Sequence, residues 1–191
     1  MTWQNLPGPK VGAGGEYFLP FGRLLVLALS LGAAVPMPAA AQAASIHYSP
    51  GENLEHIDLG LLRSARASID FAGYVVTDWP VAEELVRAAG RGVRVRVVLD
   101  PSAKHAADKL APLGAQVRQK AKGALMHLKS YAVDGSTLRT GSANFSPSGL
   151  KRQNNDLVVI RDAQAVERFQ AEFEALWRAA APYAPAAGDG R

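Results

Sequence analysis

Six residues at fixed offsets in one short window offer side chains suited to phosphoryl chemistry. They are His127, Lys129, Asp134 after four intervening residues, and Gly141, Ser142 and Asn144 after six more. An imidazole can act as nucleophile or base, an ammonium as a fixed cation and a carboxamide as a hydrogen-bond donor. That combination suits an anionic phosphoryl group, whose charge must be stabilised in the transition state. The alternative is a surface hairpin with a stray histidine and lysine, and six residues at fixed offsets make it the weaker interpretation.

Two short strands joined by a tight turn must position these residues. Residues 128–133 and 137–140 are β-prone, and Asp134-Gly135 between them is a strong turn signal. Side chains alternate along a strand, so His127 and Lys129 share one face. Asp134 has the opposite parity or lies in the turn, which predicts a supporting role rather than acid catalysis.

The spacing resembles the H-x-K-x4-D-x6-G-S-x-N motif of the phospholipase D superfamily, and all six defining positions match. The lead-in Arg-Gly-Val-Arg-Val-Arg-Val-Val-Leu-Asp at residues 91–100 is also similar to that superfamily. The closest resemblance is to its small exported bacterial endonucleases. The resemblance implies an α/β fold: a single phospholipase D-like half-domain, with a mixed β-sheet flanked by helices on both faces. Because the motif occurs once, it also implies a homodimer that builds one site from two copies.

The resemblance further implies a role for each motif residue. His127 is expected to be the nucleophile that forms a phosphohistidine, with the partner subunit's His127 as general acid and base. Lys129 and Asn144 are expected to hold the non-bridging phosphoryl oxygens. Ser142 either donates another hydrogen bond or caps its loop. Side chains supply the positive charge, so no metal and no other cofactor is expected.

One further acidic residue and several cations are candidates outside the motif. Family members carry an acid, most often Glu, at the position aligned with Asp156, where it would orient His127; the alternative is a plain strand-start residue. Residues predicted to bind substrate beside Lys129 and Asn144 are Arg118, Lys120, Lys122, Lys151 and Arg152. Such cations would attract the phosphates of a nucleic acid, and their alternative is a solvated edge and loop.

The N-terminal segment predicts export. A cationic flank at Arg23, an apolar run at residues 24–35 and a small-x-small site ending at Ala43 indicate a signal peptide over residues 1–43. An uncleaved anchor is the minority interpretation, because roughly 20 apolar residues are needed to cross a bilayer. The expected location is periplasmic or secreted, with the phosphodiesterase domain at residues 44–180 and a flexible tail at 181–191.

The remaining chain alternates predicted strands and helices, which favours an α/β sheet covered on both faces. The predicted helices span residues 53–66, 77–90, 103–113 and 163–179, and further strands span 45–48, 68–76, 93–99, 115–118 and 157–160. A loop is expected over residues 142–152. The chain has no cysteine and a formal net charge of +4, so thiol chemistry is excluded, while basicity alone decides nothing.

Three functions remain open at this point. The leading hypothesis is a non-specific endonuclease that cuts DNA or RNA. The first alternative is a phospholipase D that releases head groups from phospholipids, because the same chemistry serves both substrates. The second alternative is a nucleic-acid-binding protein without turnover, which the intact His127, Lys129 and Asn144 argue against.

Overall fold

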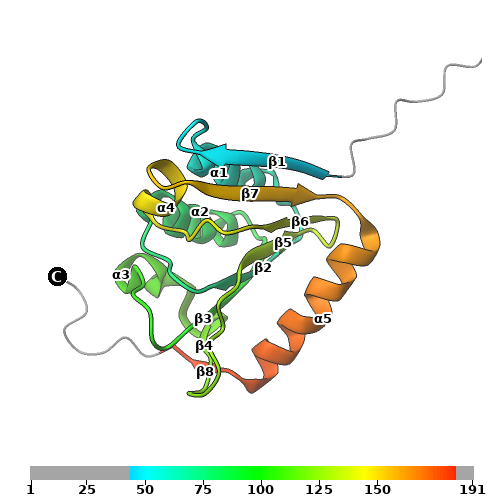
Figure 1. Cartoon of the computed structure of the whole chain (residues 1–191). Coiled ribbons are helices and arrows are strands. Elements are labelled where there is room, and N and C mark those ends of the chain that lie inside the picture. Colours follow the sequence, from blue (N-terminus) through cyan, green and yellow to red (C-terminus); the bar gives the residue numbers. More distant parts are fainter. Residues whose placement is uncertain (1–43, 184–191) are drawn as a thin grey trace, which may run out of the picture. The chain divides into compact units, whose positions relative to one another are not determined.

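The computed structural model describes residues 44–183. The predicted signal peptide at residues 1–43 and the end of the predicted tail at residues 184–191 lie outside the described residues. The described chain forms one eight-stranded sheet in the order β1-β7-β6-β5-β2-β3-β4-β8 (Figure 1). Its strands are β1 (Ala44–Ser49), β2 (Ser68–Gly73), β3 (Arg94–Leu99), β4 (Val117–Gln119), β5 (Lys129–Val133), β6 (Thr137–Thr140), β7 (Asn155–Ile160) and β8 (Ala181–Pro182). β3 pairs in parallel with β2 and β4, and every other pairing is antiparallel.

Helices occupy the connections between these strands. They are α1 (Leu54–Ser64), α2 (Trp79–Gly90), α3 (Ala107–Leu110) with a 3-10 continuation at Ala111–Gln116, α4 (Pro147–Lys151) and α5 (Ala163–Ala179). An oxygen-bearing side chain accepts a hydrogen bond at the start of four of them, from Asn53, Asp78, Ser146 and Asp162. Within residues 44–183, no helix is long and apolar enough to cross a membrane.

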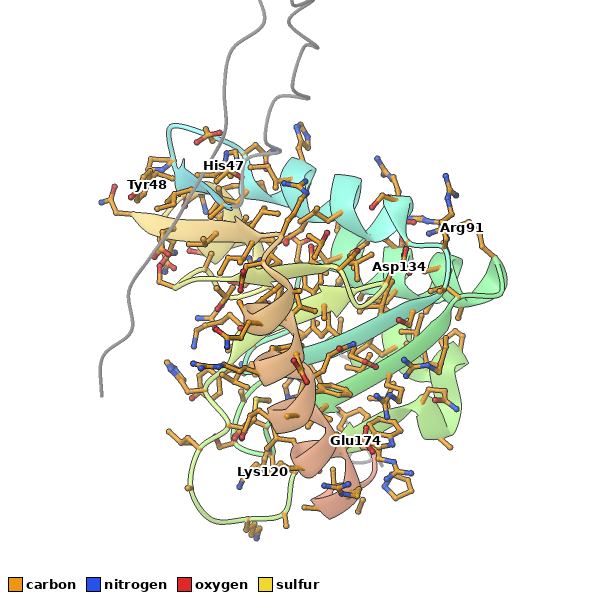
Figure 2. The ribbon with its side chains drawn as sticks, turned by 90° about the vertical axis from the view of Figure 1, so that its right-hand side faces the viewer. His47, Tyr48, Arg91, Lys120, Asp134 and Glu174 are labelled. Atoms are coloured by element: carbon orange, nitrogen blue, oxygen red, sulfur yellow. The ribbon has the colours of Figure 1, made fainter. Side chains whose placement is uncertain are left out.

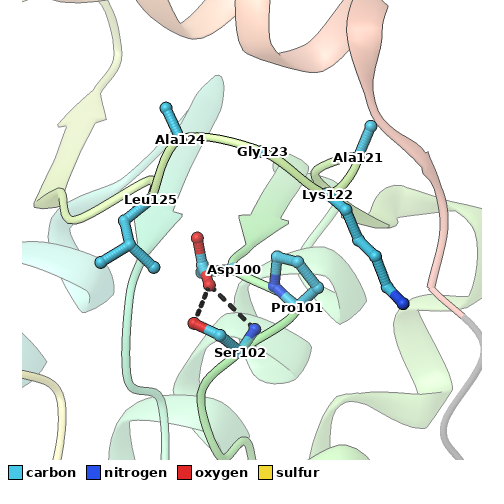
Figure 3. Close-up of a pocket in the computed structure, with 8 residues that line it drawn as sticks. All are labelled: Asp100, Pro101, Ser102, Ala121, Lys122, Gly123, Ala124 and Leu125. Atoms are coloured by element: carbon cyan, nitrogen blue, oxygen red, sulfur yellow. Dashed lines mark hydrogen bonds between the residues drawn. The ribbon is translucent and has the colours of Figure 1, made fainter.

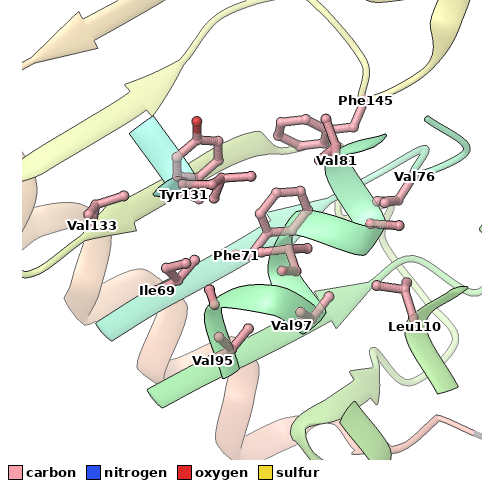
Figure 4. Close-up of a cluster of buried hydrophobic side chains, with 14 of the residues drawn as sticks. Ile69, Phe71, Val76, Val81, Val95, Val97, Leu110, Tyr131, Val133 and Phe145 are labelled. Atoms are coloured by element: carbon pink, nitrogen blue, oxygen red, sulfur yellow. The ribbon is translucent and has the colours of Figure 1, made fainter. Parts of the chain in front are cut away.

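The sheet carries a separate apolar core on each face, which confirms the predicted arrangement of helices on both sides. Ile69 and Phe71 of β2 point into the core that includes α1 and α2 (Figure 4). Ala72 has the opposite parity and packs with Phe169 and Phe173 of α5. Because successive side chains of β2 point to opposite faces of the sheet, this one strand contributes residues to both cores.

Three local predictions were wrong. The helix expected at residues 103–113 is only a short turn of α-helix followed by a 3-10 segment, which is kinked at Gly114, where φ is 53°. The loop expected at residues 142–152 contains α4. Residues 181–183, which were expected to belong to the flexible tail, are paired with the sheet, because β8 pairs with β4 and the Tyr183 N–H donates to the Val117 carbonyl at 2.9 Å. A strand at a sheet edge offers unpaired backbone groups that a nearby extended segment can satisfy.

A buried ion pair connects α1 to β6 of the sheet. The Arg139 guanidinium donates to both carboxylate oxygens of Asp58, at 2.9 Å and 3.0 Å, and both side chains are 0% exposed. The Tyr131 hydroxyl donates to the same carboxylate at 2.8 Å. Burial raises the pKa of Asp58, and the charge and hydrogen bonds of Arg139 oppose that rise. Arg139 also donates to the carbonyls of Lys129 at 2.7 Å and Ala143 at 3.3 Å.

Removing one member of this pair should destabilise the fold more than replacing both. Arg139→Met leaves an unpaired carboxylate in the core, and we expect it to lower the free energy of unfolding by about 3–5 kcal/mol. Asp58→Leu combined with Arg139→Met should recover a large part of that loss, since two apolar side chains need no partner. Urea titration of the two single variants and the double variant measures the coupling. A single Arg139→Met loss below about 1 kcal/mol would contradict the prediction.

Candidate active site

The predicted catalytic residues come together at one end of the sheet. Lys129 begins β5 and lies opposite Gly73, the last residue of β2. Because β6 is antiparallel to both β5 and β7, the loop that carries Ser142 and Asn144 leaves β6 at that same end. Asp156, the second residue of β7, lies there too. The topology therefore explains how residues 29 positions apart, from His127 to Asp156, reach one site.

Tyr74 links the two leading catalytic candidates and was not singled out from the sequence. It directly follows β2, and its N–H donates to the Leu128 carbonyl at 2.8 Å. Its ring lies 4.4 Å from the His127 ring, centroid to centroid, and 5.0 Å from Lys129 Nζ. A tyrosine after a strand carries no motif signal, so only the fold reveals this contact.

Lys129 is held rigidly while His127 stays accessible. Lys129 is 7% exposed, and its Nζ donates to the His127 carbonyl at 2.8 Å. Burial lowers the pKa of Lys129. The His127 imidazole is exposed and forms no hydrogen bond within residues 44–183. The site therefore presents a free imidazole next to a fixed cation.

Hydrogen bonds between Ser142 and Asp156 fix the loop after β6 to the start of β7. The Ser142 hydroxyl donates to Asn155 Oδ1 at 3.1 Å and accepts from the Asp156 N–H at 3.0 Å. The Ser142 N–H donates to Asp156 Oδ1 at 3.3 Å. Gly141 has a φ of 135°, and a Cβ there would lie 2.5 Å from the Asp156 carbonyl oxygen. This geometry corresponds to the loop-cap alternative for Ser142.

The orienting role predicted for Asp156 has no matching hydrogen bond in the described part of the chain, where its carboxylate binds the Ser142 N–H and not the His127 ring. The shorter Asp side chain, in place of the Glu typical of the family motif, reaches its own loop. Asp156 is therefore placed at the site as a loop anchor in this single copy of the chain.

One atom of the Asn144 side chain has no hydrogen-bond partner in the described residues. Its side-chain Oδ1 is buried and has no hydrogen-bond partner within residues 44–183. The loop around it is fixed, because the Thr77 and Asp78 N–H groups donate to the Phe145 carbonyl at 2.8 Å and 2.9 Å. A buried polar group without a partner is costly, and this oxygen needs a hydrogen-bond donor, whereas Nδ2 of the same carboxamide can donate to an anion.

Asp134 lies at the opposite end of the sheet from the catalytic candidates. It occupies the β5–β6 turn with a φ of 52°, and its N–H donates to the Ser68 carbonyl at the start of β2. Its carboxylate accepts from the N–H groups of Arg66, Ala67 and Ser68 at 2.7–3.2 Å. Figure 2 shows Asp134 at one end of the strands and Lys120, on the loop before β5, at the other. Asp134 thus joins the turn to the α1–β2 connection.

The predicted substrate-binding cations divide into two groups. Arg118 stacks on Trp177 at 4.1 Å and donates to its carbonyl, and Lys151 pairs with Glu55 and Asp78. Lys120 Nζ donates to the Ala124 carbonyl at 2.7 Å, so it braces its own loop. These three cations are engaged in internal contacts. Lys122 and Arg152 are exposed and have no ion pair within residues 44–183.

The described residues contain no group of three or more His, Asp or Glu side chains arranged to hold a metal ion. The lysine nearest to His127 in the sequence is Lys129, at the start of β5.

Comparison with known proteins places the whole arrangement in a family. The family model described as "Cardiolipin synthase, PLD-like domain" matches residues 59–177. The mitochondrial cardiolipin hydrolase of Chlamydomonas reinhardtii is 30% identical over 123 residues, and that of Xenopus tropicalis is 31% identical over 133 residues. These alignments cover 62% and 68% of this chain, and 55% and 62% of the two relatives. The chain therefore spans little more than half the length of these curated relatives.

Solved structures give a more complete overlap. Nuc from Salmonella typhimurium, a phospholipase D family member, is 26% identical with a TM-score of 0.67, and the match covers 74% of this chain and 98% of Nuc. NucT from Helicobacter pylori has a TM-score of 0.65 at 20% identity, and the match covers 73% of this chain and 98% of NucT. The second similarity supports the fold alone.

Neutralising Asp134 should destabilise the fold in a pH-dependent way. Asp134→Asn keeps a side chain that tolerates a positive φ but loses the charge that three N–H groups share, and we expect a loss of about 1–3 kcal/mol at neutral pH. Burial opposes ionisation, but the hydrogen bonds from Ser68, Ala67 and Arg66 hold the pKa of Asp134 below its ordinary value. A carboxylate with a depressed folded-state pKa contributes stability above its unfolded pKa and loses it as the pH falls through the folded value. The difference between wild type and variant should therefore shrink below about pH 4.

Chemical unfolding from pH 3 to pH 7 measures this difference. Asp108→Asn, which changes an exposed carboxylate in α3, is the matched control and should be near neutral. An Asp134→Asn difference that does not depend on pH would contradict the proposed charge effect.

Proposed function

The chain belongs to the phospholipase D superfamily, and we propose that it is an exported, metal-independent phosphodiesterase. Its substrate is a nucleic acid, which it cuts as a non-specific endonuclease, and its active site is shared across a homodimer. The observation that carries this proposal is the free, exposed His127 imidazole beside the buried Lys129 ammonium, at the sheet end that also holds Asn144.

In the proposed mechanism His127 attacks phosphorus in line, so that a P–N bond forms as the P–O bond to the leaving group breaks. The partner subunit's His127 protonates the leaving oxygen and then removes a proton from the water that attacks the phosphohistidine. The second displacement breaks the P–N bond and regenerates the free imidazole.

Lys129 and Asn144 stabilise the charge that develops on the non-bridging oxygens. Lys129 is fixed by its bond to the His127 carbonyl and by the Tyr74 ring, so little reorganisation is needed when the charge forms. Asn144 acts through its Nδ2 group, which donates to a non-bridging oxygen, because its Oδ1 can only accept a hydrogen bond.

Two observations bear on the choice of substrate. The match to Nuc spans 98% of that chain, which supports a compact nuclease built from a single half-domain. The curated relatives are cardiolipin hydrolases, which favours phospholipid as the second candidate. Export rests on the predicted signal peptide at residues 1–43, and a periplasmic or secreted location is part of the proposal.

A single assay series separates these functions. Purified protein is incubated in EDTA with supercoiled plasmid and, separately, with vesicles that contain cardiolipin or phosphatidylcholine. We expect plasmid nicking, and we expect His127→Asn to reduce it by at least about 100-fold, because the nucleophile is lost. His56→Asn is the matched control, since His56 is an exposed histidine of α1, and it should retain full activity.

Lipid hydrolysis without nicking would replace the nuclease proposal with the phospholipase alternative. Plasmid retention without cleavage of either substrate would favour the binding-only alternative. Activity that requires an added divalent ion would contradict the metal-independent mechanism.

The shared site makes a separate prediction for mixed dimers. Heterodimers with one wild-type and one His127→Asn subunit, isolated through two different affinity tags, hold one functional histidine per shared site. We expect their nicking rate to fall at least about 100-fold below that of wild type. Half of the wild-type rate, or a fully active monomer in analytical ultracentrifugation, would contradict the shared site.

A further inference from the structure

A pocket of about 300 Å³ opens beside the segment that leads into His127. It lies between the loop that follows β3 and residues 121–125 (Figure 3). Leu125 lines this pocket and is 59% exposed. Two residue steps span at most about 7 Å, so a group bound against Leu125 would adjoin a phosphate bound at His127.

The floor of the pocket carries a fixed acceptor. Asp100 Oδ1 accepts from the Ser102 N–H at 2.9 Å and from the Ser102 hydroxyl at 2.6 Å, and Oδ2 accepts from the Met126 N–H at 2.8 Å. A carboxylate offers about four acceptor positions, so these three bonds leave capacity for one more donor. Burial opposes ionisation, but the bonds from Ser102 and Met126 lower the pKa of Asp100. Asp100 is therefore an anion at neutral pH.

The walls and rim of the pocket have different chemistry from its floor. Pro101 and Leu125 give apolar surfaces, and the exposed Lys122 adds one cation. The carboxylate disfavours a phosphate inside the pocket, whereas the apolar walls suit a flat ring. The ring must also bring a hydrogen-bond donor to Asp100, because a carboxylate only accepts.

We propose that this pocket is a base-binding subsite that accepts a nucleobase with an exocyclic amino group, next to the scissile phosphate. This inference rests on the proposed nuclease function and replaces its lack of sequence specificity with a base preference at one position next to the cut. Cytosine, adenine and guanine each present an amino group, and a carboxylate that accepts from cytosine N4 is an established pairing. Thymine and uracil offer only one N–H, and it is flanked by two carbonyl oxygens that the Asp100 carboxylate repels. Lys122 binds a phosphate of the same strand.

The test maps where the enzyme cuts. A pool of single-stranded oligonucleotides of random sequence is cleaved in EDTA, and the products are sequenced to give the base frequencies around each cut. We expect one position next to the cut to favour amino-bearing bases over thymine by at least about 5-fold. Asp100→Asn and Leu125→Ala should both reduce that ratio to below about 2-fold. Asp100→Asn changes the bond to the Met126 N–H, which lies next to His127 in the chain. Leu125→Ala leaves that bond intact, so a loss of base preference in this variant reports on the pocket and not on a displaced His127.

Ile46→Ala is the matched control, because Ile46 is a similarly exposed aliphatic residue, 55% exposed, on the distant edge strand β1. It should keep the wild-type base preference. Cleavage with equal frequencies of all bases would overturn the subsite, and so would a preference that survives both pocket variants. If wild type cuts none of the oligonucleotides but hydrolyses cardiolipin, the nuclease function itself fails and the subsite fails with it.

Discussion

The contact between Asp58 and Arg139 is the constraint on which the rest of the site depends. Arg139 is fully buried, and its guanidinium reaches the helix α1, the first residue of β5 and the loop after β6 at once. The carbonyls that it binds belong to Lys129 and to Ala143, the residue before Asn144. A single planar group with five donors can fix three segments in this way because its geometry is rigid. Burying the pair costs desolvation energy, and what the fold gains is the relative placement of two catalytic candidates.

The placement of the candidate residues at one end of the sheet was more predictable from the sequence than the contacts that support them. His127, Lys129 and Asn144 stand at offsets that reflect a strand, a turn and a second strand, so their spacing carries the geometry directly. The sheet with helices on both faces followed from alternating periodicities in the same way. Tyr74 had no such signal, because it approaches His127 from β2, a strand distant in sequence. Arg139 was also overlooked, since an arginine with strand parity looks like a solvated residue until its partner in α1 is known.

The supporting residues show why local interpretation is limited. Asp134 was predicted to stabilise its own turn, and in the structure its carboxylate binds the backbone at the start of β2, more than 60 residues earlier. β8 was missed because Ala181–Pro182 has no strand propensity of its own and pairs only because the edge of β4 is available. Both cases are tertiary contacts that override local preference.

The distribution of charge explains how a mildly basic chain can have a sharply localised site. Arg94 and Arg96 of β3, prominent in the sequence, bind Asp70, and Arg96 also binds Glu174 of α5. Arg118 stacks on Trp177 of the same helix. Arg96 and Arg118 thus hold α5 against the sheet, and all three arginines are engaged in internal contacts. In the proposed mechanism Lys129 acts on the phosphate from inside the site, and its burial strengthens that interaction because nearby water screens it less. A second copy of the chain would double this charge at the shared phosphate, which is a physical reason for a half-site to dimerise beyond the need for a second histidine.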